Sequence, residues 1–293
     1  NVGPYNLGGL PDKRNYTVRS DMTSLTRLSV LARANYSWMS RYLFTLTVRG
    51  DGSSMFAKGH KWGFFPAAAF RWNITNEGWM AGAKANGLTN LALRFSAGRS
   101  GNDSVASYVS QQYLTVTTGS WIFGDGQQSV AYPSKVDNDS LSWEKTDSFN
   151  AGLDLSLLND RVVISADAYL TRTGDLLLAL QNASQTGFSS RYANIGGTRG
   201  WGIELSLSSH NITRRHFNWE TTFTFSHNNS VVTDIGAEFD YVATYTKNSQ
   251  MLYGYKVGYP VNALWGYKCC GVWHNDEERE ANRTTRAYAS YQN

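Results

Sequence analysis

Long segments of the sequence alternate apolar and polar residues, and this feature most limits how the chain folds. A period of two places successive side chains on opposite faces of a β-sheet. In residues 42–49, for example, Phe44 lies on one face and Arg49 on the other. Nine segments follow the pattern, the third and the ninth less regularly: 27–36, 42–49, 64–72, 91–98, 149–157, 162–171, 201–208, 217–226 and 263–273. The pattern predicts an all-β fold of about nine strands.

The lengths of the links between these segments add a second regularity. Short links at 39–41, 159–161 and 213–215 alternate with long ones at 102–140, 174–198 and 229–261. The link 75–90 is of medium length, and its NEGWMAGAKA stretch predicts a helical turn. Short turns at one end and long loops at the other are typical of an antiparallel up-and-down transmembrane barrel. A soluble Greek-key sandwich, the alternative, mixes loop lengths at both ends.

Composition narrows the classes of protein further. No stretch of about 18 consecutive apolar residues occurs, which excludes a transmembrane helix. The net charge of +4 comes without a dense run of Lys and Arg, so we expect no nucleic-acid partner. Aromatic residues make up 14% of the chain and charged residues 17%, the latter below the roughly 25% of soluble domains. This balance suits a sheet with an extensive amphipathic surface.

The two faces of the predicted strands differ in charge. The apolar face carries no charged residue over the seven regular segments, as expected where a charge would meet lipid. We predict that the charged residues of the other face line a lumen and meet a plug or a solute: Arg27, Arg33, Arg49, Arg71, Arg94, Asp154, Asp167, Glu204 and Glu220. The alternative is the solvated face of an ordinary sheet. Nine strands cannot close a wide pore, so we expect further strands from sequence outside this chain.

Signals for catalysis and metal binding are weak. The five histidines lack metal-ligand spacing, and no Gly-x-Ser-x-Gly elbow or phosphate-binding loop occurs. Cys269 and Cys270 are adjacent and define neither a disulfide framework nor a metal site. The acidic group from Asp276 to Glu280 is interpreted as a solvated loop. We therefore predict that the protein is not an enzyme and that it has no cofactor and no metal.

The letters of the sequence resemble one family. RYLFTLTVRGDGSSMFAKGHKWGFFP at 41–66 is similar to the RY-strand, DGSS-x-F loop and aromatic-Pro strand of SusC/RagA-like TonB-dependent transporters of the Bacteroidetes outer membrane. Further pieces follow in family order: RANYSWMSRY (33–42), LALRFSAGRSGN (91–102), LSWEKTDSFNAGLDLSLLNDRV (141–162), DAYLTRTGDLLL (167–178), ANIGGTRGWGIELSL (193–207) and GVWHNDEE (271–278). The 51–56 segment is the strongest of these signatures.

The resemblance implies a 22-stranded barrel with an N-terminal plug. Residues 1–293 would be a section of the C-terminal half of that barrel, without an internal domain boundary, and the plug would lie outside this chain. The family implies import of oligosaccharides or peptides across the outer membrane, with a SusD-like surface lipoprotein and the TonB complex as partners. A non-transporting surface adhesin or a soluble carbohydrate-binding β-domain is the alternative.

Aromatic residues in the long loops are candidate contacts. Sugar rings bind well to aromatic faces flanked by polar groups. We predict contact with substrate or lipoprotein for six of them: Tyr108, Tyr113, Trp121, Phe123, Tyr132 and Tyr192. Residues of this kind also form the interfacial girdles of membrane proteins, which is the alternative.

Overall fold

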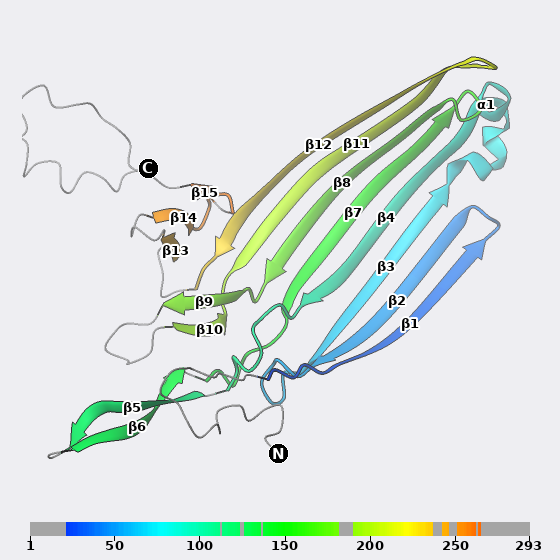
Figure 1. The fold of residues 1–293 in the computed structure, drawn as a ribbon. Helices are drawn as coiled ribbons and strands as arrows, with labels where there is room; N and C mark the ends of the chain where they lie inside the picture. Colours follow the sequence, from blue (N-terminus) through cyan, green and yellow to red (C-terminus); the bar gives the residue numbers. More distant parts are fainter. Residues whose placement is uncertain are drawn as a thin grey trace, which may run out of the picture.

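The computed structural model describes residues 22–111, 113–123, 126–135, 137–181, 190–236, 242–245, 251–261 and 263–264. Eight long antiparallel strands form one open, curved sheet in the order β1-β2-β3-β4-β7-β8-β11-β12 (Figure 1). They are β1 (Arg27–Trp38), β2 (Tyr42–Ser53), β3 (Trp62–Asn73), β4 (Leu88–Asn102), β7 (Glu144–Leu157), β8 (Val162–Gly174), β11 (Gly197–Arg214) and β12 (Phe217–Asp234). The first eight predicted strands are confirmed as an up-and-down meander, and the sheet does not close on itself.

One end of the sheet carries the short connections. The β1–β2 turn places Met39 and Ser40 at φ 51° and 54°, the left-handed region that the twist of a tight hairpin requires. Arg41 closes this turn by donating its N–H to the carbonyl of Trp38 at 3.0 Å. The medium link holds η2 (Ile74–Asn76), η3 (Gly78–Met80) and α1 (Ala81–Ala85), so the predicted helical turn is confirmed.

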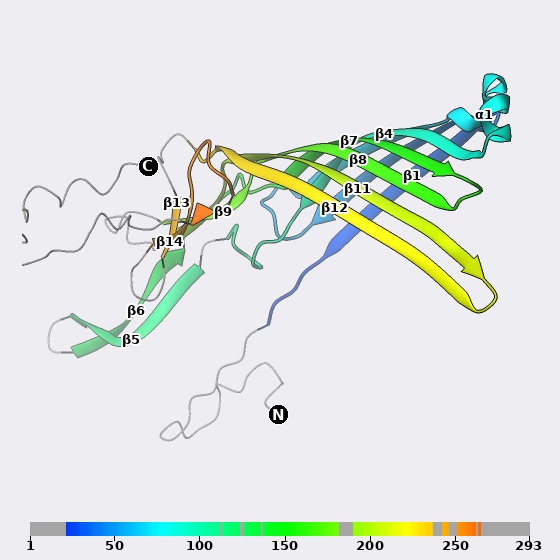
Figure 2. The ribbon, with the colours of Figure 1, turned by 90° about the horizontal axis from the view of Figure 1, so that it is seen from above.

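The other end carries the long connections, and these contain strands that the amphipathic pattern missed. They are β5 (Tyr113–Phe123) with β6 (Gly126–Lys135), β9 (Leu177–Gln181) with β10 (Ser190–Asn194), and the small sheet β13 (Val242–Tyr245), β14 (Met251–Tyr255) and β15 (Ala263–Leu264). Figure 2 shows these small elements at the opposite end of the long strands from α1. Of the predicted strand at 263–273, only β15 lies within the described residues.

The register keeps the apolar side chains together across the strands. Phe70 lies opposite Phe44 on one side and opposite Phe95 on the other, and Phe95 faces Ala151 in turn. No layer of protein packs over this surface, and Phe44, Phe95 and Phe149 are 47%, 49% and 55% exposed. We call this surface the apolar face, and the opposite surface of the same sheet the charged face.

The buried core is small and lies at the end with the long connections. It consists of Phe56, Phe65, Val109, Leu141 and Trp143. The Trp143 ring packs 5.0 Å from Phe56 and 5.3 Å, edge-on, from Phe65, and its Nε1 donates to the carbonyl of Lys61 at 3.0 Å. Trp143 therefore holds the 51–56 segment against the residues that lead into β7.

Candidate functional site

A network of ion pairs crosses the middle of the charged face. Arg71 of β3 donates Nη1 to Asp154 Oδ2 of β7 at 2.7 Å, and Arg94 of β4 donates Nε to the same oxygen at 3.0 Å. Arg94 also donates Nη2 to Asp167 Oδ2 of β8 at 2.9 Å. Ser165 accepts from Arg94 at 3.2 Å and donates to Asp154 at 3.2 Å. The network joins four strands and uses four of the nine predicted charged residues.

A glycine makes the central contact of this network possible. Arg94 lies directly opposite Gly152 of β7, and Gly152 lies directly opposite Asp167 of β8. A Cβ atom at Gly152 would stand 2.6 Å from Asp167 Oδ1 and 2.8 Å from the guanidinium of Arg94. The Arg94 side chain thus reaches across an entire strand because that strand carries no side chain at this position.

Four of the five remaining predicted charged residues form separate contacts. Arg27 binds Asp103 through two hydrogen bonds of 2.8 and 2.9 Å, and Arg33 donates to Thr47 at 3.1 Å. Arg49 pairs with Asp51 at 2.7 Å. Glu220 lies 3.0 Å from His210 Nδ1. Glu204 is exposed and has no ion pair among the described residues. Asp51, Asp103, Ser165 and Gly152 were not predicted from the sequence, because alternation assigns a face but no cross-strand neighbour.

Two of the six aromatic candidates have described side chains. Tyr192 of β10 is half-buried and packs against the core around Trp143. The hydroxyl of Tyr108, also half-buried, accepts a hydrogen bond from the Ser24 N–H at 2.9 Å. The backbones of Tyr113, Trp121, Phe123 and Tyr132 belong to the β5–β6 hairpin, but their side chains lie outside the described residues. Contact of these aromatics with substrate or partner stays a prediction.

The apolar face ends in a row of charged residues near the long connections. Arg99, Asp147, Arg172 and Arg199 lie opposite one another in β4, β7, β8 and β11. They fall in parts of the strands that extend beyond the predicted segments. Alternation places them two residues beyond Ala97, Phe149, Leu170 and Trp201 on the apolar face. We call this row the basic rim.

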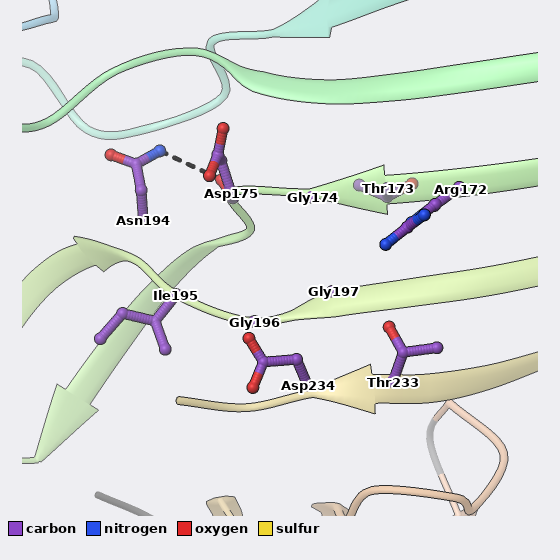
Figure 3. Close-up of a pocket in the computed structure, with 10 residues that line it drawn as sticks. All are labelled: Arg172, Thr173, Gly174, Asp175, Asn194, Ile195, Gly196, Gly197, Thr233 and Asp234. Atoms are coloured by element: carbon purple, nitrogen blue, oxygen red, sulfur yellow. Dashed lines mark hydrogen bonds between the residues drawn. The ribbon is translucent and has the colours of Figure 1, made fainter. Parts of the chain in front are cut away.

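A hollow of about 350 Å³ opens beside the basic rim (Figure 3). Arg172 lines it together with Gly174, Gly196 and Gly197, which leave space because they carry no side chains. Asp175 and Asp234 also line it. Asp175 pairs with Lys145 at 3.2 Å, and Asp234 Oδ1 accepts the Gly236 N–H at 3.0 Å.

A carboxylate anchors aromatic residues at the other end of the apolar face. Glu77, in the connection between η2 and η3, accepts hydrogen bonds from the Tyr42 hydroxyl at 2.7 Å, Trp72 Nε1 at 3.0 Å and Arg41 Nη1 at 3.2 Å. These donors, Tyr42 first, hold the pKa of Glu77 below its usual value because they stabilise the ionised form. The aromatic rings with polar tips are typical of a membrane–water interface.

Two further properties concern the described residues alone. No helix in these ranges is long and apolar enough to cross a membrane. No group of three or more His, Cys, Asp or Glu side chains in the described part of the chain is arranged to hold a metal ion. Cys269, Cys270 and the acidic residues 276–280 lie outside the described residues.

Comparison with known proteins gives a consistent result. The family described as "TonB dependent receptor-like, beta-barrel" matches residues 2–292. The TonB-dependent receptor SusC of Bacteroides thetaiotaomicron is 34% identical over 257 residues, covering 84% of this chain and 25% of SusC. The TonB-dependent receptor P26 of Formosa agariphila is 32% identical over 286 residues, covering 96% of this chain and 28% of that protein. The chain thus spans about a quarter of the length of these relatives.

A solved structure supports the same assignment. The RagAB peptide transporter aligns with a TM-score of 0.74 and 26% identity, over 85% of this chain and 26% of that one. The open sheet is therefore a section of an outer-membrane β-barrel, whose long connections are extracellular. The family match extends over nearly the whole chain, and the relatives named above are TonB-dependent receptors, so the chain belongs to the TonB-dependent receptor-like β-barrel family.

Proposed function

We propose that residues 1–293 form one continuous section of the wall of a TonB-dependent importer, with its extracellular loops. The apolar face meets lipid and the charged face lines the lumen, where it contacts the plug or the solute. The cargo is an oligosaccharide, with a peptide as the second candidate, and a SusD-like lipoprotein and the TonB complex are the partners. SusC among the relatives and the RagAB peptide transporter among the structures support the two cargo classes.

The observation that carries this proposal is the network around Arg94. Four charged side chains from four strands gather on one face, whereas the middle of the other face is apolar. In a bilayer, charged groups are stable on a strand only where they face water or protein. A partly exposed network of Arg and Asp therefore fits a hydrated lumen occupied by a plug.

Charge reversal at Arg49 tests the function. Arg49 is 53% exposed on the charged face and pairs with Asp51, so Arg49→Glu replaces an attraction by a repulsion. We expect uptake of the cognate nutrient by cells carrying the full-length protein to fall about tenfold, while the amount of barrel in the outer membrane stays within about twofold. Arg215→Glu, an exposed position in the β11–β12 turn, is the control. Normal growth of the Arg49→Glu strain on that nutrient would sink the proposal.

The cargo class has its own test. A strain that lacks the full-length gene is compared with its parent for growth on oligosaccharides and on peptides as sole carbon source. A defect confined to oligosaccharides supports the first candidate, and one confined to peptides supports the second. Equal growth of both strains on all of these sources, or a full-length gene without a plug-encoding region, would exclude the importer.

A further inference from the structure

We propose that the apolar face carries a binding site for one acylated lipid with a net negative phosphate headgroup, with its tail in a groove and its phosphate between Arg172 and Arg199. The inference rests on the proposed orientation of the apolar face toward lipid. Two independent features carry the proposal: a groove in the apolar face, and a pair of arginines in the basic rim next to that groove.

The groove results from the placement of small side chains. It has a volume of about 800 Å³ and crosses β2, β3, β4, β7 and β8. Ala68 lies directly opposite Ala97, and Ala151 lies directly opposite Ala168, so neighbouring strands leave the same places empty. Phe95 and Phe149 border these alanines and stand out from the sheet, at 49% and 55% exposure. An acyl chain that lies in this space contacts the aromatic rings on both sides.

The arginine pair is unfavourable by itself. Arg172 and Arg199 lie directly opposite each other in β8 and β11, and like charges in this position destabilise a sheet. Both are exposed, and neither has an ion pair among the described residues. Asp147, the neighbour of Arg172 on its other side, attracts Arg172, but its two oxygens are bound by Arg99 through hydrogen bonds of 2.7 and 2.9 Å. An anion between the two guanidinium groups would remove the repulsion.

The hollow beside Arg172 has room for a phosphate group next to the arginine pair. Three of the ten residues that line the hollow beside Arg172 are glycines, so a headgroup can approach the backbone at these positions (Figure 3). Two acids border it: Asp175 is paired with Lys145, whereas Asp234, whose Oδ1 accepts the Gly236 N–H, keeps its negative charge. The phosphate is therefore placed on the side of Arg172 and Arg199, away from Asp234. Guanidinium groups bind phosphate oxygens through paired, charge-assisted hydrogen bonds.

The two features lie at the right separation for one molecule. Phe149 and Leu170 line the groove, and each is two residues from a member of the basic rim, Asp147 and Arg172. Two residues span about 7 Å along a strand, roughly the distance from a phosphate to the start of the acyl chains. The basic rim stands at the extracellular edge of the apolar face, where headgroups of the outer leaflet lie.

The test measures lipid retention by the purified full-length protein. The protein is placed in nanodiscs of phosphatidylcholine with 5% dioleoyl phosphatidic acid, extracted into mild detergent, and weighed by native mass spectrometry. We expect phosphatidic acid to be retained at least about tenfold over its share of the mixture, and the double variant Arg172→Gln with Arg199→Gln to lose this preference. Arg215→Gln, at the opposite end of the sheet, should retain it.

Three further measurements distinguish a specific lipid site from a non-specific apolar surface and from a site for free phosphate. Ala97→Phe, which fills the groove, should lower retention about tenfold while the barrel keeps its heat-modifiable migration in gels. Dioleoyl phosphatidylcholine also carries a phosphate, but its choline group makes the headgroup neutral overall. Its retention to the same extent as phosphatidic acid would overturn the proposal, because the net negative charge of the headgroup would then play no part. Inorganic phosphate that competes at millimolar concentration would show a site for free phosphate instead of a lipid. Lipid retention is measured on purified protein and nutrient uptake is measured in cells. A failure of the lipid proposal can therefore be told apart from a failure of the proposed function.

Discussion

Single residues decide whether the charged face forms its network, and Gly152 is the clearest example. A methyl group there would displace Arg94 or Asp167, since both lie within 2.8 Å of the position of a Cβ atom. We expect Gly152→Ala to lower the free energy of unfolding of the full-length barrel by about 1–3 kcal/mol, the range for loss of charge-assisted hydrogen bonds. Urea unfolding in phospholipid vesicles measures the change.

Gly50 provides the matched control for that substitution. It also lies in a strand of the sheet, β2, but a Cβ atom added there meets nothing within 4 Å. Gly50→Ala should therefore leave stability unchanged or raise it slightly, because alanine restricts the unfolded chain. An equal loss in both variants would mean that the Arg94 contact to Asp167 contributes nothing.

Glu77 gives the molecule a pH dependence at the periplasmic end. Its pKa is lower in the folded protein than in the unfolded chain, so its contribution to stability is present above the unfolded value of about 4.5 and is lost as pH falls through the folded value. We expect the melting temperature of the wild-type barrel to fall more steeply below that pH than the melting temperature of Glu77→Gln. Parallel pH profiles for the two proteins between pH 7 and pH 3 would contradict the anchoring role.

The sequence predicted residues of this kind unevenly, for a physical reason. Alternation assigned Arg94 and Asp154 correctly to one face of the sheet. The face of a residue depends only on its position along its own strand, because successive side chains point to opposite faces. Their contact depends on register between distant segments and on the absence of a side chain at Gly152, which no local pattern contains. Glu77 was missed because its partners come from two strands and a turn.

At the scale of the element, each strand has one apolar side and one charged side. The same substitution should therefore change stability by different amounts on the two sides. Leu153 lies midway along the apolar side of β7, and Asn150 lies on the charged side of the same strand. Leu153→Arg should cost about 2–4 kcal/mol of stability in a bilayer, since a charge near the midplane leaves water. Asn150→Arg should cost less than about 1 kcal/mol, because this position faces the hydrated side. Similar costs for the two variants, measured by unfolding in vesicles, would refute the assignment of faces.

The ends of the strands show where the sequence pattern loses information. Alternation stops at Gly98 in β4 and at Thr171 in β8, because the next residues on the apolar face are Arg99 and Arg172. The strands nevertheless continue, since backbone pairing outside the hydrocarbon does not require an apolar side chain. The β5–β6 and β9–β10 hairpins were missed for the same reason, as strands above the membrane need no lipid-facing surface.

At the scale of the molecule, strand length separates membrane from extracellular space. A tilted transmembrane strand needs about 9–11 residues, whereas β7, β11 and β12 have 14, 18 and 18. From Phe149 to Leu157 the apolar side of β7 extends about 27 Å at about 3.4 Å per residue, or about 20 Å of membrane depth at a tilt of about 40°. In β7 the surplus lies toward the long connections, where the loop-end core around Trp143 stabilises it without help from lipid. β11 also extends past Val162, the first residue of β8, at the end with the short turns.

The open sheet makes a final prediction about the chain in isolation. β1 and β12 are the outermost strands of the eight, and segment 256–261 covers only the extracellular end of β12, through bonds such as Val232 N–H to the Tyr259 carbonyl at 2.9 Å. Each unpaired backbone group in hydrocarbon costs several kcal/mol, so residues 1–293 alone should not insert as a stable section. We expect the isolated chain, refolded into vesicles, to be fully digested by trypsin, whereas the full-length protein keeps a protected barrel.

If the isolated chain were protected from trypsin, its two open edges would have to be paired in some way. Closure by self-association would pair the β1 edge of one copy with the β12 edge of another, and cross-linking in vesicles would then show oligomers. A protected monomer would contradict the open sheet, because no monomer of these eight strands can satisfy both edges without closing. Because the edges of β1 and β12 are left open in the isolated chain, the substitutions in the charge network and in the basic rim are to be tested in the full-length protein.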